Sequence, residues 1–292
     1  MLQKEILKKI RRIQITTSKL VADVFAGQYK SVFKGRGMEF YEVRQYMPGD
    51  EMRTIDWNVT ARMGEPYVKT FIEERELTVM LLLDASMSCR FGSAKQLKSQ
   101  VAAELCSVLA FSAIKNNDKV GLIIFTDRIE KFVPPRKGLR HVLRVIREAL
   151  YFKPEGKGTD INNVLDYLNR VTKRRTIAFM VSDFFDRDFK SILSVSNKRH
   201  DVVAVTITDP REIEMPDVGI IALDDAETGE DFIIDTGNKN FRKQYKKDAL
   251  RRMDERRKLL RSVNVDNIDV RTDSPYTESL IKFFRMRERR FA

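Results

Sequence analysis

Cysteine and histidine are scarce in this sequence, with two of each among 292 residues. Cys89 and Cys106 cannot build a disulfide framework, and they lack the close spacing of a metal-binding or redox pair. Neither His141 nor His200 is placed near a candidate nucleophile, so each is expected to be a surface or helix-capping residue. These scarcities argue against thiol chemistry and against catalysis by a histidine-activated nucleophile.

Long apolar runs are also absent. The longest stretch, residues 77–83, is interrupted by Thr78 and is too short to cross a bilayer. Residues 1–12 are basic and amphipathic, without the apolar region and cleavage site of a signal peptide. No Gly-x-x-x-x-Gly-Lys-Ser/Thr loop occurs, which excludes an ATPase of that class. With 42% hydrophobic residues the chain is too apolar for a disordered protein. We therefore expect a cytoplasmic globular protein that is not an enzyme.

Acidic residues are too few to balance the basic ones, and the formal net charge is +12. Residues 1–66 carry +4, residues 67–237 carry −1 and residues 238–292 carry +9. A basic terminal region can bind nucleic acid or an anionic membrane. It can equally be a solvated helix face, because Asp248, Asp254 and Glu255 interrupt the positive charge. The near-neutral middle of the chain is therefore the better place to look for a specific site.

The hydrophobic pattern predicts a helix at the start of the chain, ending near Gly27, and then a turn-rich segment of short strands up to residue 66. Strands and helices alternate from residue 67 onward. Strands are expected at 77–83, 120–125, 128–133, 176–181, 202–208 and 268–270, and helices at 94–114, 139–150, 162–171, 189–196, 239–262 and 276–286. The third strand is expected to stop at Pro134. Residues 211–237 break the rhythm and read as an inserted β-hairpin.

This order predicts an α/β fold with a doubly wound, mainly parallel sheet flanked by helices. The expected domains are residues 1–66, an N-terminal helix with a docked extension, and residues 67–292, the sheet domain. In such sheets ligands bind beyond the carboxyl ends of the strands. Polar residues follow three of these elements: Asp84, Ser86 and Ser88 after the first buried strand, Thr159 after a glycine turn, and Asp183 after a later strand.

Hydroxyl and carboxylate oxygens are hard ligands that suit Mg²⁺ or Mn²⁺. Ser86, Ser88 and Thr159 are expected to bind the ion directly, while Asp84 and Asp183 orient waters and hydroxyls. Neutral direct ligands would leave the ion electrophilic and favour a carboxylate from a partner. The alternative is that these residues are ordinary helix caps; for Asp160, beside Thr159, capping is the preferred interpretation.

The chain resembles von Willebrand factor A-like domains that carry a metal-ion-dependent adhesion site. The residues that match this site are Asp84, Ser86, Ser88, Thr159 and Asp183. More narrowly, the chain is similar to the bacterial family called domain of unknown function 58. The segments that carry this resemblance are 35–40 (GRGMEF), 44–50 (RQYMPGD), 53–57 (RTIDW), 61–62 (AR), 209–212 (DPRE), 216–219 (PDVG) and 225–229 (DAETG). Cys89 stands where the family often has methionine, which should affect packing rather than metal binding.

The resemblance implies a partnership with MoxR-type AAA+ ATPases, because members of this family are typically found beside them. The expected function is a non-catalytic, metal-dependent protein-interaction module, an adaptor or chaperone-like partner that grips a client through an acidic side chain. The alternatives are binding of nucleic acid or an anionic membrane through the basic helix 239–262, and a metal-dependent hydrolase.

A second constellation lies in the turn-rich segment and consists of charged and aromatic residues. Its members are Arg44, Asp50, Arg53, Asp56, Trp57 and Arg62. One interpretation is a docking surface built on forked arginines. The preferred one is a salt-bridged clamp that ties the segment to the main domain.

Overall fold

The computed structural model describes residues 39–72, 77–224 and 231–291. The predicted N-terminal helix lies outside these residues. The described residues form two compact units, with the division between Leu77 and Thr78. The strand Tyr67–Ile72, which the predicted domain boundary after residue 66 places in the sheet domain, belongs to the first unit.

The first unit is a two-stranded antiparallel sheet with short helices in its connection. It contains β1 (Glu39–Gln45), η2 (Met52–Thr54), α3 (Trp57–Met63) and β2 (Tyr67–Ile72). β1 confirms the predicted short strands, but α3 was not predicted. Asp56 accepts hydrogen bonds from the backbone N–H groups of Asn58 and Val59 and thereby starts this helix. Gly64, in the left-handed conformation, ends it.

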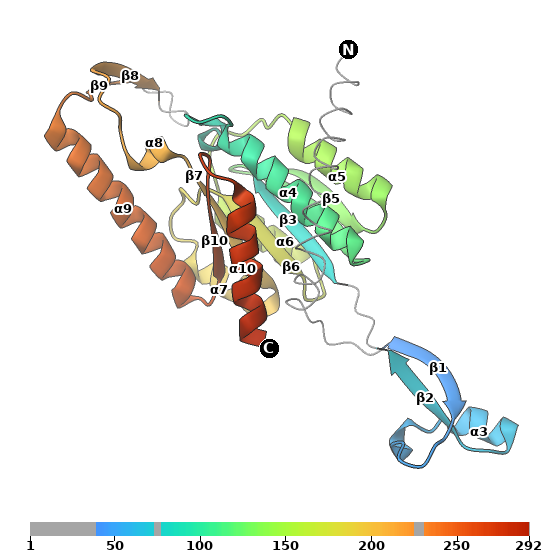
Figure 1. Ribbon diagram of the computed structural model, residues 1–292. Helices are drawn as coiled ribbons and strands as arrows, with labels where there is room; N and C mark the ends of the chain where they lie inside the picture. The colour runs from blue at the N-terminus through green and yellow to red at the C-terminus, as the bar shows by residue number, and fades with distance from the viewer. Residues whose placement is uncertain (1–38, 73–76, 225–230, 292) are drawn as a thin grey trace. The chain divides into compact units, whose positions relative to one another are not determined.

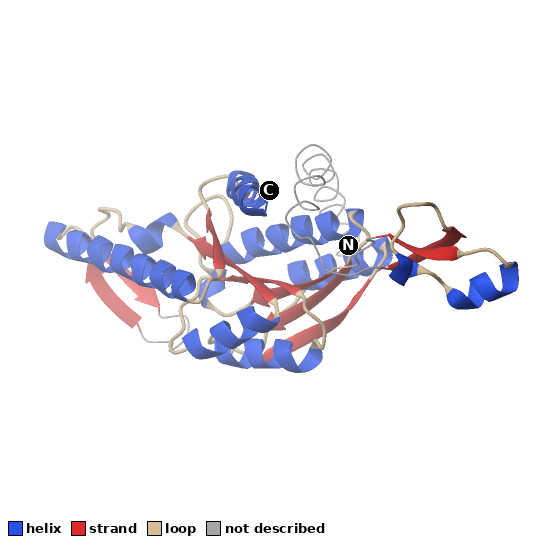
Figure 2. Cartoon of the chain, turned by 90° about the horizontal axis from the view of Figure 1, so that it is seen from below, coloured by secondary structure: helices blue, strands red, loops and turns tan. Residues whose placement is uncertain are grey.

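The second unit is a six-stranded sheet with helices on both faces (Figures 1 and 2). Its strands are β3 (Thr78–Asp84), β4 (Lys119–Phe125), β5 (Ile129–Arg136), β6 (Ile177–Ser182), β7 (Asp201–Thr208) and β10 (Asp266–Arg271), in the spatial order β10-β7-β6-β3-β4-β5. All neighbours are parallel except β4 and β5. The predicted fold class, a mainly parallel α/β sheet, is confirmed.

The helices are α4 (Lys98–Lys115), α5 (Leu139–Tyr151), α6 (Ile161–Val171), α7 (Lys190–Arg199), α8 (Pro210–Ile213), α9 (Lys239–Ser262) and α10 (Tyr276–Phe291), with the short η3 at Ser88–Arg90. Alternate residues of the central strands face opposite layers, so one continuous core joins Met80, Leu82 and Phe125 to α6 and α7. The other set of alternate residues faces α4 and α5, which pack on each other. A sheet covered on both faces explains the continuous apolar character of β3 and β6.

Two boundaries differ from the sequence predictions in an informative way. β5 continues through Pro134 and Pro135 to Arg136. It is the edge strand, and its pairing with β4 is irregular at this end, so the missing proline N–H groups cost little. The predicted hairpin is present as β8 (Ile220–Asp224) and β9 (Asp231–Asp235). Across the described part of the chain, no helix combines the length and apolar character that a membrane span requires.

Candidate metal-binding site

The candidate site lies between two adjacent strands whose following helices cover opposite faces of the sheet. β3 and β6 are adjacent at the centre of the sheet. The chain leaves β3 for α4 on one face and leaves β6 for α7 on the other. Such a switch point opens a crevice at the carboxyl ends of the strands. Asp84 is the last residue of β3, and Asp183 follows β6 directly.

The turn after β3 gathers two hydroxyl groups into one small space. Asp84 is 1% exposed, and its Oδ1 accepts a hydrogen bond of 2.9 Å from the backbone N–H of Ser86. This contact folds the chain back, so that Ser86 Oγ and Ser88 Oγ lie 3.0 Å apart. Ser88 starts η3. The structure therefore shows the convergence of hydroxyls that the Asp-x-Ser-x-Ser spacing predicts.

The loop containing Thr159 is held at the same edge by close backbone contacts. The N–H of Met87 donates to Lys157 O at 2.9 Å, which joins this loop to the serine turn. Gly156 is required here, because a Cβ would collide with the side chains of Thr126 and Asp127. Thr159 Oγ1 lies 3.5 Å from Asp84 Oδ2. Thr159 is thus brought to the Asp84 carboxylate, as predicted.

The third segment approaches Asp84 from β6. Ser182 Oγ donates to Asp84 Oδ2 at 2.6 Å. Phe184 has a φ of 58°, an uncommon conformation for a bulky residue, and its N–H donates to Ser182 Oγ. This sharp turn keeps Asp183 buried at the edge of the sheet, where the N–H of Phe185 donates to Asp183 Oδ1 at 3.2 Å.

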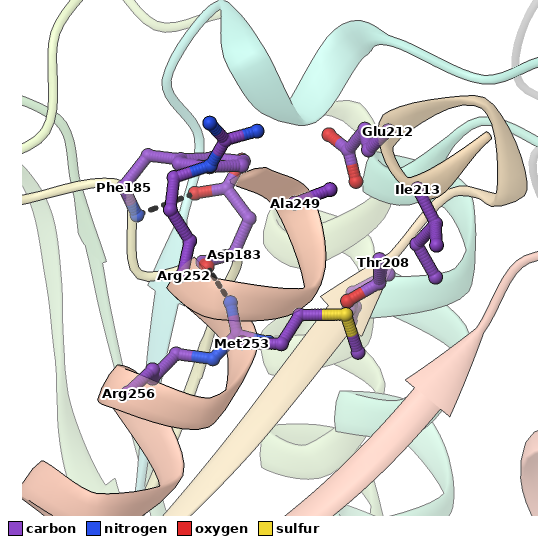
Figure 3. Close-up of a pocket in the computed structure, with 10 residues that line it drawn as sticks. Asp183, Phe185, Thr208, Glu212, Ile213, Ala249, Arg252, Met253 and Arg256 are labelled. Atoms are coloured by element: carbon purple, nitrogen blue, oxygen red, sulfur yellow. Dashed lines mark hydrogen bonds between the residues drawn. The ribbon is translucent and has the colours of Figure 1, made fainter. Parts of the chain in front are cut away.

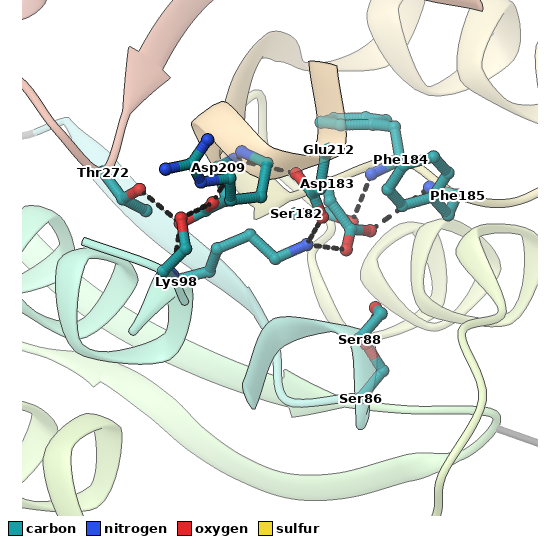
Figure 4. Close-up of polar contacts among 12 residues, drawn as sticks. Ser86, Ser88, Lys98, Ser182, Asp183, Phe184, Phe185, Asp209, Glu212 and Thr272 are labelled. Atoms are coloured by element: carbon teal, nitrogen blue, oxygen red, sulfur yellow. Dashed lines mark hydrogen bonds and ion pairs between the residues drawn. The ribbon is translucent and has the colours of Figure 1, made fainter. Parts of the chain in front are cut away.

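A buried lysine completes the cluster (Figure 4). Lys98, the first residue of α4, is 1% exposed, and its Nζ donates to Asp183 Oδ2 at 2.7 Å. The same ammonium forms an ion pair with Glu212 Oε1 on α8. Glu212 in turn accepts the N–H of Asp209 in a capping box. The candidate site is therefore linked to the segment that leads to the β8–β9 hairpin.

A second cation reaches Asp183 from α9 (Figure 3). Arg256 Nη1 donates to the main-chain oxygen of Asp183 at 2.9 Å, while its Nε and Nη2 are buried without a protein partner. Arg256 lines a cavity of about 20 Å³ together with Asp183 and Glu212. That volume has room for about one water molecule and not for an organic ligand.

Burial dominates the electrostatics of the cluster. Burial, reinforced by the neighbouring Asp183, raises the pKa of Asp84 to about 6. Burial opposes the charged form of Lys98, but the carboxylates of Asp183 and Glu212 outweigh it and raise its pKa above the ordinary value. Burial, with Asp84 and Asp183 nearby, raises the pKa of the Cys89 thiol well above its usual range. Lys98 is therefore an ammonium and Cys89 a neutral thiol.

The oxygen donors present fit a small divalent ion. An octahedral Mg²⁺ with oxygens at about 2.1 Å places neighbouring ligands about 3.0 Å apart. The separation of Ser86 Oγ and Ser88 Oγ equals that edge. The Cys89 sulfur and one oxygen each of Asp84 and Asp183 lie within 4.8 Å of one another. Hydroxyl and carboxylate oxygens outnumber the single sulfur among these donors, and such oxygens are ligands of hard ions.

Other predicted residues have local structural contacts. Asp160 caps α6 by accepting the N–H of Asn163 at 2.8 Å, as predicted. Arg44 forms a two-pronged pair with Asp50, and Asp56 pairs with Lys69, so both pairs close within the first unit. The remaining members of that constellation, Arg53, Trp57 and Arg62, have exposed side chains.

Several basic side chains of helix α9 form ion pairs. Lys246 pairs with Glu214, Arg257 with Asp269, and Lys258 with Asp254. Arg256 points inward to Asp183. Exposed pairs of this kind contribute little stability, but they lower the positive charge available to phosphates.

Sequence reasoning missed Lys98, Glu212 and Arg256. In sequence, Leu97 has the four-residue spacing of an apolar stripe with Val101 and Leu105, yet it is 38% exposed. Lys98 is instead the residue in phase with these two buried side chains. The signal was a lysine on the apolar stripe at i, i+3 and i+7. Glu212 and Asp209 have the spacing of a capping box, which predicts a local role for Glu212. The neighbouring sequence does not indicate the contact of Glu212 with Lys98.

Two bacterial proteins illustrate the similarity of this chain to known sequences. An uncharacterized protein of Mycobacterium tuberculosis, Rv1480, is 30% identical over 285 residues, covering 96% of this chain and 89% of that protein. YeaD of Bacillus subtilis, also uncharacterized, is 29% identical over 105 residues, covering 36% of this chain and 24% of that protein.

Solved structures give more distant matches. An aerotolerance-related membrane protein from Bacteroides fragilis is 16% identical, with a TM-score of 0.48, covering 73% of this chain and 99% of that chain. BatB from Bacteroides thetaiotaomicron is 18% identical, with a TM-score of 0.44 and the same coverage. The family described as "Protein of unknown function DUF58" matches residues 42–255. Because this match covers more than half of the chain, the chain belongs to the DUF58 family.

Proposed function

We propose that this protein is a non-catalytic, metal-dependent interaction module. One observation carries the proposal: the hydroxyls of Ser86 and Ser88 lie 3.0 Å apart beside two buried carboxylates, at the switch point of the sheet. Ser86, Ser88 and Thr159 would hold Mg²⁺ or Mn²⁺, with Asp84 and Asp183 orienting them. The ion would supply an electrophilic centre for a partner's carboxylate. The protein's own residues fix the hydroxyls and exclude water from the carboxylates behind them.

Isothermal titration with Mn²⁺ and Mg²⁺ tests the metal site. We expect saturable binding to the wild type and about 10–100-fold weaker binding to Asp84→Asn, because this carboxylate orients the hydroxyls. Ser88→Ala should weaken binding similarly by removing a direct ligand. The control is Asp166→Asn, an exposed carboxylate on α6 that pairs with Arg170, which should bind like the wild type. Equal heats in the wild type and Asp84→Asn would refute the assignment.

The partner we propose is a MoxR-type AAA+ ATPase, with this protein acting as its adaptor on client proteins. The support is the family membership and the solvent-accessible position of Ser88 beside the buried carboxylates. We expect capture of the ATPase by this protein to weaken about tenfold or more in chelator or in Ser88→Ala, since a charge-to-metal contact would be lost.

Capture that resists both chelator and Ser88→Ala would contradict a metal-mediated interface. Trp57, 68% exposed on α3, then marks the alternative surface. Exposed tryptophans are frequent anchors of protein interfaces. In that case Trp57→Ala, and not Ser88→Ala, would abolish capture.

A further inference from the structure

Lys98 is an unusual residue to find beside a cation site. Its side chain is fully buried, and burying an ammonium is costly unless it is paired. Its two partners are Asp183, behind the predicted metal ligands, and Glu212, on α8. The lysine thus brings a permanent positive charge to a place that is expected to attract a divalent cation.

Protein donors already satisfy the two carboxylates at this edge. Asp183 Oδ1 accepts the Phe185 N–H, and Asp183 Oδ2 accepts Lys98 Nζ. Asp84 Oδ1 accepts the Ser86 N–H, and Asp84 Oδ2 accepts Ser182 Oγ. An incoming ion would therefore meet mainly neutral hydroxyls. Its affinity and its preference for a further ligand depend on the charges standing behind those hydroxyls.

The charged groups that these contacts connect are Asp84, Asp183, Glu212, Lys98 and Arg256, with a net charge of −1. A bound divalent ion changes the sum to +1. Without Lys98 the same sums would be −2 and 0. Lys98 therefore makes the empty site less attractive to a cation and the loaded site more attractive to an anion. Both effects are strong, because the pairs are shielded from water.

We propose that Lys98 sets the ligand preference of the site, so that the divalent ion and a carboxylate of the partner bind cooperatively. The ion alone binds weakly; the carboxylate neutralises the surplus positive charge and strengthens its binding. The carboxylate of Glu212, the second partner of the Lys98 ammonium, partly offsets the positive charge of Lys98 and so reduces this cooperativity. The inference rests on the metal-dependent function proposed above and adds to it a reason why the site would load only in the presence of an acidic partner.

The test measures Mn²⁺ affinity by isothermal titration, with acetate as the carboxylate probe and chloride at matched ionic strength as its control. In the wild type, acetate should tighten Mn²⁺ binding several-fold. Lys98→Met, which keeps the length of the side chain and removes its charge, should bind Mn²⁺ about tenfold more tightly without acetate and lose most of the acetate effect. Glu212→Gln should show the opposite: weaker Mn²⁺ binding alone and a larger acetate effect than the wild type.

These opposite shifts separate an electrostatic role from a structural one, because damage to the fold would weaken Mn²⁺ binding in both variants. Unchanged or weaker binding by Lys98→Met, or an equal acetate effect in all three proteins, would overturn the inference while leaving the metal site intact. If the wild type bound no Mn²⁺ at all, the proposed function itself would fail. Should Lys98→Met not fold, the acetate effect of Glu212→Gln decides: a larger effect than in the wild type supports the inference, and an equal or smaller one overturns it. Capping boxes accept glutamine, so this variant should fold.

Discussion

Replacing Lys98 by methionine is expected to lower the free energy of unfolding by about 3–5 kcal/mol, the usual cost of removing one partner from a buried ion pair. The change leaves the carboxylates of Asp183 and Glu212 without their shared cation, and Asp183 is 1% exposed. Urea unfolding monitored by circular dichroism measures the loss. A surface lysine change, Lys258→Met, removes only an exposed pair with Asp254 and should cost less than about 1 kcal/mol.

A double-mutant cycle assigns the loss to the ion pair. In the Glu212→Gln background, Lys98→Met leaves only one carboxylate unpaired, so its cost should fall by about 1–3 kcal/mol. The cycle needs no metal and is measured in chelator. Strictly additive losses would show that Lys98 and Glu212 are not coupled, and would weaken the electrostatic inference as well.

The sequence predicts the residues at the strand ends of the site but not the ion pair of Lys98 behind them. The residues after β3 and β6 were predictable, because a buried run that ends in a polar residue marks both a strand and its carboxyl end. Which face each chain connection covers then follows from the handedness of parallel crossovers. Lys98 on α4 and Glu212 on α8 are far apart in sequence and meet only in the folded chain. No spacing rule relates them, so their ion pair required the structure.

Helices and strands were predictable from the sequence wherever a regular apolar pattern and a clear capping residue agreed. α9 runs over the predicted residues 239–262, since Asn238 caps it and its apolar stripe is regular. Prediction failed where tertiary context outweighed local preference. Pro134 and Pro135 stop a central strand but are accepted at an edge, and only the strand order shows that β5 lies there. α3 was missed because one capping residue, Asp56, and a glycine stop decide a seven-residue helix.

His200 is the C-cap residue of α7 and is fully buried, so it meets the helix-capping alternative of the prediction and not the surface one. Its Nε2 lies 3.3 Å from Thr172 Oγ1, whose proton is already donated to Leu168 O. Nε2 must therefore donate, which leaves Nδ1 as a buried nitrogen without a partner. Protonation would add a buried charge and an unsatisfied N–H. Burial, with Arg199 and Arg175 nearby, accordingly lowers the pKa of His200 to about 4.

The consequence is a loss of stability in mild acid. An unfolded histidine titrates near pH 6.5 and the folded one near 4, so the unfolded state binds more protons between these values. Stability is then complete above about pH 6.5 and falls by about 3 kcal/mol as the pH drops to about 4. His200→Gln, which retains a donor for Thr172, should remove this component of the pH dependence of the unfolding free energy.

His141→Gln is the matched control for this measurement. It removes the other histidine, whose Nε2 lies 2.9 Å from Val120 O, and it leaves His200 in place. The part of the pH dependence that we assign to His200 should therefore remain in this variant. Because acidic groups elsewhere also titrate in this range, the informative quantity is the difference between wild type and His200→Gln at each pH. A difference that stays constant from pH 7 to 4 would mean that His200 binds its proton as easily in the folded protein as in the unfolded chain, which its buried, unpartnered Nδ1 argues against.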